Sequence, residues 1–448
     1  MAQNNSLDSF VKNRNVIIIA GVALFAMIIL MLANALGFRL GGRQQLEKVN
    51  IVMWGVWDDS DTIGSYATEF RKLYPNISVE YRKFTPQEYE TELINALAAG
   101  RGPDIFAMHH TWLGKHKDKM AAMPEDVMTL KEYQDRFVDV VNKDFIDGES
   151  IYGFPLYTDT LALFYNKDAF NDAGIANPPK TWEELQAIVP QLTKIDENGN
   201  IRQAGVAMGT GENINRSPDI LTSLMFQLGA EMTAPDDPTR ITFAQNNRVS
   251  GQQISPASLA INFYTDFANP RKEVYTWNAA QNNSIDAFYE REVAMMFGYS
   301  YQVEAVKAKA PRLNFAIAPL PQISLDSGLA NFANYWGYGV SNQSQTPKEA
   351  FAFLKFMTEK ENSQNYFLKT KRPTPRRDLV ETQSQDIDYG VFVKQVLQAK
   401  TWRQPDNNSV DRVFIETMNI VNSGLLDANR AMSQAQADIQ VLADNFSK

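Results

Sequence analysis

The run Val49-Asn50-Ile51-Val52-Met53-Trp54 begins an alternation of strand and helix that decides the fold. Its apolar and β-branched residues predict a strand, and the apolar pattern of residues 63–73 predicts a helix that stops at Tyr74-Pro75-Asn76. Residues 77–81 then alternate apolar and polar side chains, which is typical of a half-exposed strand. This rhythm of strand, helix and strand predicts layered α/β architecture.

The same rhythm continues along the chain. Three segments begin with a threonine followed three residues later by a glutamate, which predicts a capped helix start: Thr85–Glu88, Thr181–Glu184 and Thr346–Glu349. Further strands are expected at residues 105–108, 161–165, 205–208, 293–297, 315–318 and 336–340. The tail from Asp411 has apolar residues spaced three and four apart, which predicts helix.

Length and charge exclude several classes of function. The chain has 448 residues, with 43 basic and 52 acidic side chains and a net charge of −9. Residues 1–48 are net basic, so the remaining body is more acidic than the whole. An acidic body without a basic tract argues against nucleic acid as a partner. A body of this length should divide into about two or three domains.

Catalytic motifs are missing from the sequence. There is no cysteine, which excludes disulfides, thiolate metal sites and a lipidated cysteine anchor. No phosphate-binding loop, dinucleotide fingerprint, serine-hydrolase elbow or zinc-protease motif is present. The three histidines, His109, His110 and His116, lack standard metal spacing, so a role in a loop or cleft is favoured over metal binding. We expect a protein that is not an enzyme and uses no cofactor or metal.

The N-terminus predicts a membrane segment. No charged residue lies between Arg14 and Arg39, and Val16–Gly37 is almost wholly apolar. As a helix, this stretch would span ~33 Å, enough to cross a bilayer core. The length favours an uncleaved signal anchor, with residues 1–15 cytoplasmic, 16–37 in the membrane and 38–48 as a linker. The alternatives are a signal peptide cut after Ala35 and, less favoured, a buried core helix. The anchor and the signal peptide both place residues 38–448 on the extracytoplasmic side.

Several motifs resemble those of one protein family. Gly100–Ile105 is similar to a Gly-x-x-Pro-Asp turn, and Tyr152–Pro155 leads into Tyr165-Asn166-Lys167-Asp168 and then Pro178–Leu185. Later landmarks include Glu292–Gly298 and Arg372–Arg376. In order and spacing, this series resembles the extracellular solute-binding proteins of the sugar-binding, maltodextrin-binding-like class of ABC transporters. The resemblance covers roughly residues 49–448.

The resemblance implies a type II periplasmic-binding-protein-like fold, in which two α/β lobes enclose a cleft. The first lobe would comprise residues 49–158 and 325–372, and the second residues 159–324 and 373–448. The chain would cross between the lobes near residues 157–160, 321–334 and 371–375. Ligand capture would then proceed by hinge closure.

In the family the loops after the first strands face the cleft, so ligand contacts are expected there. A sugar-binding site needs flat aromatic rings for the apolar ring face and planar polar groups for the hydroxyls. The candidates from the first half of the chain are Trp54, Trp57, Asp58, His110, Trp112 and Asp159. Two structural alternatives stay open: Trp54 could cap the lobe core, and Asp104 is better explained as a turn residue.

The second half of the chain supplies the remaining candidates. They are Asn215, Tyr299, Tyr301 and Trp336, in the loops after predicted strands or on the return crossover. Packing at the hinge is the alternative for Trp336. Asn213 and Arg216 are further polar candidates, whereas Arg376 or Arg377 could pair with Asp378 instead of ligand.

The expected function is capture of a sugar or oligosaccharide for the permease of an ABC importer. Two alternatives remain. Aromatic rings and acids could also bind a polyamine or another organic cation. A membrane-anchored ligand sensor would need the same fold and tether.

Overall fold

The computed structural model describes residues 47–249, 252–326 and 328–446, together with Val22, Leu24, Phe25, Met27, Ile28 and Met31, which are helical. Residues from Asn50 onward form one compact unit. The predicted anchor Val16–Gly37 and its flanks 1–15 and 38–48 otherwise lie almost wholly outside the described residues. Among the helices that are described, none is both long and apolar enough for a bilayer crossing.

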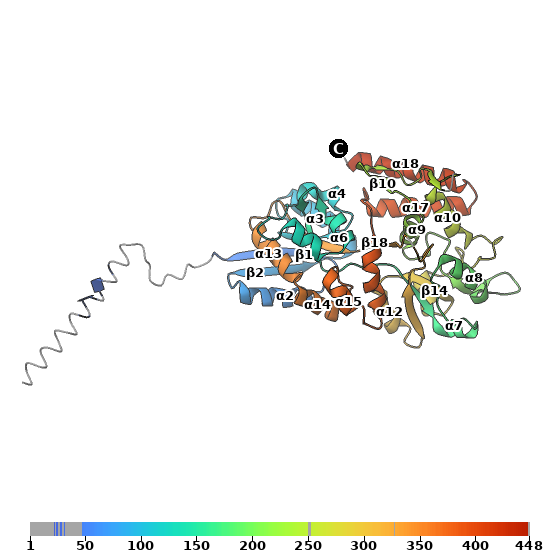
Figure 1. Ribbon diagram of the computed structural model, residues 1–448, viewed down its shortest axis with the longest axis horizontal. Helices are drawn as coiled ribbons and strands as arrows, with labels where there is room; N and C mark the ends of the chain where they lie inside the picture. Colours follow the sequence, from blue (N-terminus) through green and yellow to red (C-terminus); the bar gives the residue numbers. More distant parts are fainter. Residues whose placement is uncertain are drawn as a thin grey trace, which may run out of the picture. The chain divides into compact units, whose positions relative to one another are not determined.

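The compact unit contains two five-stranded sheets, each with its own helices (Figure 1). The first sheet has the order β2-β1-β3-β17-β6. Its strands are β1 (Val49–Gly55), β2 (Ile77–Lys83), β3 (Ile105–His109), β6 (Gly153–Pro155) and β17 (Trp336–Val340). β1 and β3 run parallel, whereas β17 is antiparallel to β3 with Trp336 opposite His109. A strand from the second half of the chain therefore lies inside the first sheet. We call this sheet and its helices the first lobe.

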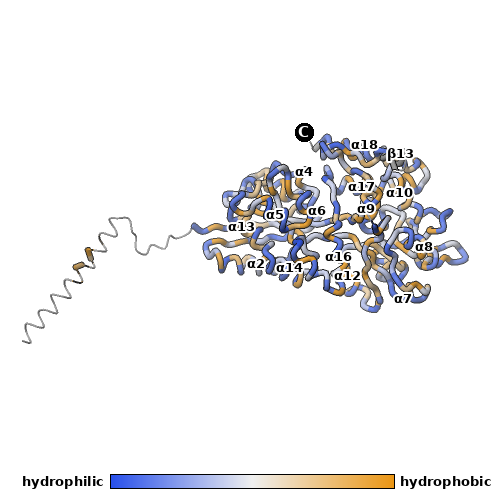
Figure 2. The backbone as a smooth tube through the Cα atoms, in the orientation of Figure 1, coloured by the Kyte–Doolittle hydropathy of each residue, from blue (hydrophilic) through white to orange (hydrophobic). Residues whose placement is uncertain are grey.

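The helices of the first lobe come from two stretches of chain, residues 60–145 and 347–370. They are α2 (Ser60–Leu73), α3 (Pro86–Ala98), α4 (Leu113–His116), η1 (Lys117–Lys119), α5 (Leu130–Arg136), α6 (Asp139–Phe145), α13 (Pro347–Met357) and α14 (Lys360–Thr370). A short hairpin, β4 (Ile146–Asp147) and β5 (Ser150–Ile151), follows α6. Hydrophobic and hydrophilic residues alternate along these helices (Figure 2), and α13 buries Leu354 completely.

The second sheet has the order β15-β7-β14-β9-β8 and forms the second lobe. Its strands are β7 (Ala162–Asn166), β8 (Lys194–Ile195), β9 (Ile201–Val206), β14 (Val293–Gly298) and β15 (Phe315–Pro319). The helices around it are α7 (Lys167–Asp172), α8 (Trp182–Leu192), α9 (Ser217–Gln227), α10 (Pro256–Asp266), α11 (Ser284–Tyr289), α12 (Gln302–Lys309) and α16 (Gly390–Gln395). Trp182 and Tyr264 are among its fully buried side chains.

The remaining elements extend this lobe or lie near the crossings. They are the hairpins β10 (Thr233–Ala234) with β11 (Asp237–Ile241) and β12 (Asn247–Val249) with β13 (Gln252–Ile254), then α15 (Arg377–Gln383), η2 (Val396–Gln398), α17 (Asn407–Asn422) and α18 (Ala428–Phe446). α17 and α18 pack on each other and on α10. α15 contacts α5 and α14 of the first lobe as well as α16 of the second.

Four segments run side by side where the chain passes between the sheets. β16 (Asn331–Phe332) pairs in parallel with β18 (Ala399–Lys400), and Thr160 bridges to Ala333. The backbone N–H of Thr158 donates to the carbonyl of Pro373 at 2.9 Å. The crossing segments are therefore tied to one another by backbone hydrogen bonds.

One class of local prediction was only partly right. Thr181 forms the predicted capping box with Glu184. Thr85 also begins a helix, but its hydroxyl donates to the Glu88 carboxylate at 2.7 Å and bonds no helix N–H. Thr346 begins α13 without a side-chain cap. Sequence spacing therefore located the helix starts but not the orientation of two of the three hydroxyls.

Candidate functional site

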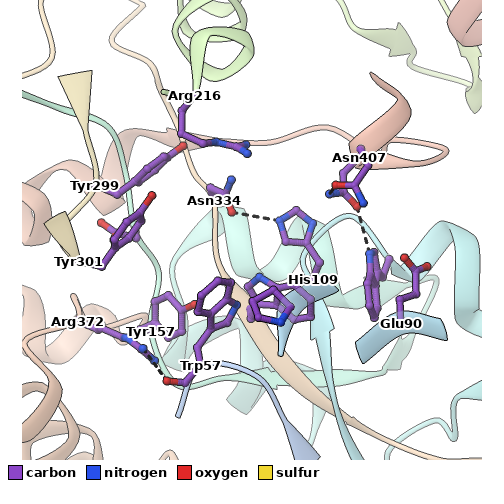
Figure 3. Close-up of a pocket in the computed structure, with 15 residues that line it drawn as sticks. Trp57, Glu90, His109, Tyr157, Arg216, Tyr299, Tyr301, Asn334, Arg372 and Asn407 are labelled. Carbon is purple, nitrogen blue, oxygen red and sulfur yellow. Dashed lines mark hydrogen bonds between the residues drawn. The ribbon is translucent and has the colours of Figure 1, made fainter. Parts of the chain in front are cut away.

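A cavity of about 390 Å³ lies between the two sheets, where the loops after β3 and β14 meet the crossing segments (Figure 3). It is lined by side chains from both lobes: Trp57, Pro86, Glu90, His109, Trp112, Tyr157, Asp159, Arg216, Tyr299, Tyr301, Asn334, Trp336, Arg372, Asn407 and Asn408. Aromatic rings and groups that hydrogen-bond make up most of this lining, as expected for a small-molecule site.

One side of the cavity is an aromatic wall formed by Trp57, His109, Trp112 and Trp336. The Trp336 ring lies at its centre, with ring centroids 5.0 Å from Trp112, 5.4 Å from His109 and 6.4 Å from Trp57. Trp57 forms the rim and is 42% exposed. Trp112 is buried, and its Nε1 donates to Asn407 Oδ1 at 3.3 Å. The contacts between rings hold flat apolar surfaces toward the cavity.

His109 joins this wall to the crossing segment. Its Nε2 lies 3.1 Å from Asn334 Oδ1 and its Nδ1 lies 2.8 Å from the Thr111 hydroxyl. Burial lowers the pKa of His109 well below its usual value, and the neighbouring His110 adds to this effect. The imidazole is therefore neutral near pH 7, with one nitrogen donating and the other accepting.

The opposite side is organised by one buried carboxylate, which we call the Asp219 network (Arg216, Asp219, Tyr299 and Asn334). Arg216 donates to both Asp219 oxygens at 2.7 and 2.6 Å, and the Tyr299 hydroxyl donates to Asp219 Oδ2 at 2.6 Å. Asn334 Nδ2 lies 3.4 Å from the same oxygen. Figure 3 shows Arg216 and Tyr299 on the side of the cavity away from His109 and Glu90.

Arg216 has a backbone conformation that is costly for its residue type. Its φ is 59° and its ψ is 32°, in the left-handed region, at the residue preceding α9. Side chains with a Cβ rarely adopt this region, and such strain concentrates at functional sites. The bidentate bond to Asp219, three residues later, fixes the guanidinium in place.

Asp159 lies on the first crossing segment and faces the cavity. Its carboxylate accepts from the Thr160 N–H at 2.9 Å and from the Ser300 hydroxyl at 2.7 Å. Burial raises its pKa to about 7, although the hydrogen bonds from Ser300 and Thr160 oppose that shift. Tyr301, 57% exposed, stacks beside Tyr299 with ring centroids 6.1 Å apart.

Six of the ten predicted ligand residues line this cavity: Trp57, Trp112, Asp159, Tyr299, Tyr301 and Trp336. Whether they contact ligand stays a prediction, but the structure does bring them together from residues 57 to 336. Of the further polar candidates, Arg216 lines the cavity, whereas Asn213 instead donates to the carbonyls of Asn278 and Gln281. As the sequence suggested, Arg376 pairs with Asp378.

Two of the other four candidates, Trp54 and Asp58, belong to the first lobe and lie outside the lining. Trp54 is 8% exposed and packs on Phe84 at 4.5 Å, which agrees with the open alternative of a core role. Asp58 is buried and accepts hydrogen bonds from the hydroxyls of Tyr338 and Tyr366 at 2.5 and 2.6 Å. These partners occupy the carboxylate that we expected to face ligand.

The last two, His110 and Asn215, also have protein neighbours instead of cavity exposure. His110 is buried, stacks on Tyr335 at 5.1 Å, and has Nδ1 3.5 Å from Asp144 Oδ2. Asn215 accepts a hydrogen bond from Gln302 Nε2 at 3.3 Å. In the same loop, the neighbouring residue Arg216 lines the cavity.

Sequence reasoning missed seven of the lining residues as ligand candidates: Pro86, Glu90, Tyr157, Asn334, Arg372, Asn407 and Asn408. Glu90 lies inside a predicted amphipathic helix, where a charged residue is normally a solvated one. Arg372 was visible only as part of a family landmark, and Asn407 and Asn408 begin α17 without any motif. Within the described residues there is no cluster of three or more side chains suited to a metal ion.

Two sheets with separate helices, tied crossing segments and an aromatic cavity between them define a two-lobe binding protein. The chain matches the model of the bacterial extracellular solute-binding protein family over residues 57–364 and belongs to that family. The resemblance predicted from sequence is therefore confirmed. Because this family consists of binding proteins, the expectation that the chain is not an enzyme is confirmed as well.

Three relatives illustrate the similarity. A binding protein of Brucella abortus is 24% identical over 309 residues, which cover 66% of this chain and 69% of the relative. The multiple sugar-binding protein of Streptococcus mutans is 22% identical over 88% of this chain and 92% of its own length. The crystal structure of the cyclic α-maltosyl-1,6-maltose binding protein from Arthrobacter globiformis matches with a TM-score of 0.73 at 18% identity, covering 89% of this chain and all of that one. The structural match confirms the predicted two-lobe fold.

Proposed function

We propose that this protein captures a sugar or oligosaccharide outside the cytoplasm and delivers it to the permease of an ABC importer. One observation carries the proposal: ring faces line one side of a 390 Å³ cavity, and fixed hydrogen-bonding groups line the other. A sugar has an apolar ring face and a rim of hydroxyls, so both sides can be satisfied at once. The name of the Streptococcus mutans relative supports this ligand class.

The mixed polarity of the lining favours a sugar over a polyamine. An ammonium group can only donate hydrogen bonds. The cavity offers donors of its own, including the Arg216 and Arg372 guanidiniums and the Asn334 amide, as well as acceptors such as Asp159. A hydroxyl donates and accepts, so it can use both kinds of group.

Binding would close the lobes by a hinge motion. In our proposal the lobes are residues 49–158 with 325–372 and residues 159–324 with 373–448, joined by the tied crossing segments. Trp57, Trp112, Asp159, Tyr299, Tyr301 and Trp336 would contact the sugar. The closed form would dock on the permease because ligand shifts the open–closed equilibrium.

We further propose that Val16–Gly37 anchors the protein in the membrane, with residues 38–448 on the extracytoplasmic side. The uncharged apolar run supports this placement. The anchor predicts that the mature protein keeps its N-terminus and remains with the membrane fraction. Mass spectrometry finding a new N-terminus at Leu36 would show cleavage after Ala35 instead.

A thermal-shift screen of residues 49–448 tests the ligand class. The panel contains mono- and oligosaccharides, polyamines, amino acids and inorganic anions. Free ligand at about a hundred times its dissociation constant adds about 2.7 kcal/mol, a shift of several degrees. We expect a shift confined to one group of sugars. A shift with spermidine and none with any sugar would overturn the carbohydrate assignment. No shift with any compound of the panel would contradict it as well.

A further inference from the structure

Each cationic side chain at the cavity already has protein partners that match its charge. Arg216 donates through Nε and Nη2 to Asp219, and its Nη1 lies 3.2 Å from Asp411 Oδ2. Two carboxylates therefore share one guanidinium. An anionic ligand at this position would meet a cation whose charge is already balanced.

Arg372 and Lys115 repeat the pattern on the first lobe. Arg372 Nη1 lies 3.0 Å from both Asp58 Oδ1 and the Tyr366 hydroxyl oxygen, and Nη2 donates to the Trp57 carbonyl at 3.0 Å. Lys115 lies beside the cavity, with Nζ 2.6 Å from Glu90 Oε1 and 2.6 Å from Asp406 Oδ2.

One carboxyl group remains without a cation. Asp159 faces the cavity and is held by hydrogen bonds from Ser300 and Thr160. In the part of the chain that the structure describes, no lysine, arginine or histidine forms an ion pair with it. Six carboxyl groups therefore surround three cations: Asp58, Glu90, Asp159, Asp219, Asp406 and Asp411. The His116 imidazole also lies 2.8 Å from Glu90 Oε1, and Asp159 is partly protonated near pH 7 because burial raises its pKa to about 7. The carboxylates still outnumber the cations.

This excess has a consequence for the choice of substrate. A carboxylate, sulfate or phosphate on a sugar would have to enter a site with surplus negative charge, or displace a protein carboxylate from its arginine. Like charges brought together in a desolvated interface repel and weaken binding. Neutral hydroxyls meet no such opposition, and they can accept from the remaining guanidinium N–H groups and donate to Asp159.

We infer that the cavity selects uncharged carbohydrates and rejects those that carry an anionic group. This inference rests on the proposed function and narrows it. It assigns the specificity to the carboxylates behind the arginines, above all to Asp219 and Asp411, rather than to the arginines themselves.

Matched pairs of ligands test the inference. Di-, tri- and tetrasaccharides of glucose, galactose and mannose are each compared with the same oligosaccharide oxidised to a carboxylate at C6. Calorimetry is done on the full-length protein in a detergent that contains no sugar. We expect the oxidised form of every bound oligosaccharide to bind about tenfold more weakly or worse. Equal or tighter binding of an oxidised form would overturn the inference but leave the proposed function standing. Failure of every sugar, oxidised or not, would overturn both.

A variant locates the selectivity. Asp411→Asn removes the second carboxylate from Arg216, and we expect the gap between neutral and oxidised sugars to narrow several-fold. Glu416→Gln on the exposed side of the same helix is the matched control and should leave the gap unchanged. An unchanged gap in folded Asp411→Asn would overturn the role given to Asp411. If that variant does not fold, the comparison of ligand pairs on the wild-type protein decides the inference alone.

Discussion

The two sides of the cavity are built on different physical principles. The aromatic wall is a set of ring contacts around Trp336, and each ring can be removed without leaving an unpaired charge. The Asp219 network depends on a single buried carboxylate that holds an arginine and a tyrosine. A substitution in the aromatic wall should therefore weaken ligand binding with little loss of stability. A substitution in the Asp219 network should lower both the stability and the ligand affinity. The four predictions below test that difference, starting from the largest expected effect.

Asp219→Asn should lower the free energy of unfolding by about 3 kcal/mol, because the half-buried Arg216 guanidinium loses the charge of its bidentate partner and keeps only Asp411. Its ligand affinity should fall as well, since Arg216 and Tyr299 are no longer held. Urea denaturation and calorimetry measure the two quantities. Leu354→Ala, at a fully buried site in α13, is the control: it should cost about 2–5 kcal/mol of stability but keep the affinity of the folded protein. A variant Asp219→Asn as stable as wild type would contradict the coupling.

Trp336→Ala should weaken ligand binding by about 2–4 kcal/mol, because it removes the centre of the aromatic wall. The free energy of unfolding should change by less than the free energy of binding. Trp336→Phe keeps a ring at the same place and should lose much less affinity. Calorimetry with the sugar found in the thermal-shift screen measures the difference. Unchanged affinity in Trp336→Ala would remove this wall from the binding site.

The stability of the ligand-free protein should depend on pH through Asp159. Its pKa is raised to about 7 in the folded protein, so the folded state keeps a proton that the unfolded state loses near pH 4. The resulting stabilisation is complete at low pH and is lost as pH rises through about 7, by about 1.4 kcal/mol between pH 6 and 8 for one such group.

Asp159→Asn should remove this decline, while the smaller one from Asp411, whose pKa burial raises to about 6, remains. Denaturation at several pH values measures it. Wild-type and variant curves that stay parallel from pH 6 to 8 would count against the effect. Trp336→Phe, which changes no titratable group, should show the wild-type profile.

Trp57→Ala should have the smallest effect, about 1 kcal/mol of binding free energy. The ring is 42% exposed at the rim and contacts Trp336 alone among the wall residues, at 6.4 Å. Its backbone carbonyl still accepts from Arg372 in the variant. Titration against the same sugar measures the change. A loss as large as that of Trp336→Ala would mean that rim and centre contribute alike.

Local patterns in the sequence predicted much of the fold. The strand expected at residues 336–340 is β17 with the same bounds, and the helix expected at 63–73 begins only three residues earlier, at Ser60. Asp104 is a turn residue as expected, because its carboxylate accepts from the Val52 N–H and the Ser344 hydroxyl. Hydrophobic periodicity and cap residues act over a few positions, so a single sequence reveals them.

Site residues were predicted correctly where aromatic rings follow a strand. They were missed where a partner far away in the sequence decides the orientation of the side chain. Trp57 and Tyr301 come directly after strands and line the cavity. Asp58 has the same local context as Trp57, yet partners 280 and 308 residues away occupy its carboxylate. The Asp219 network likewise joins residues 80 and 115 positions apart. The residues on either side of Asp58 do not show that these distant partners will hydrogen-bond to its carboxylate.

The placement of the tryptophans gives this protein a built-in optical reporter. Three of the seven line the cavity, and the other four, Trp54, Trp182, Trp277 and Trp402, are buried. An indole that leaves water emits at shorter wavelength, so a ligand that covers Trp57 should shift the emission of the whole protein to the blue. Substrate capture could then be followed in real time without any attached dye, and Trp57→Phe would silence most of the signal.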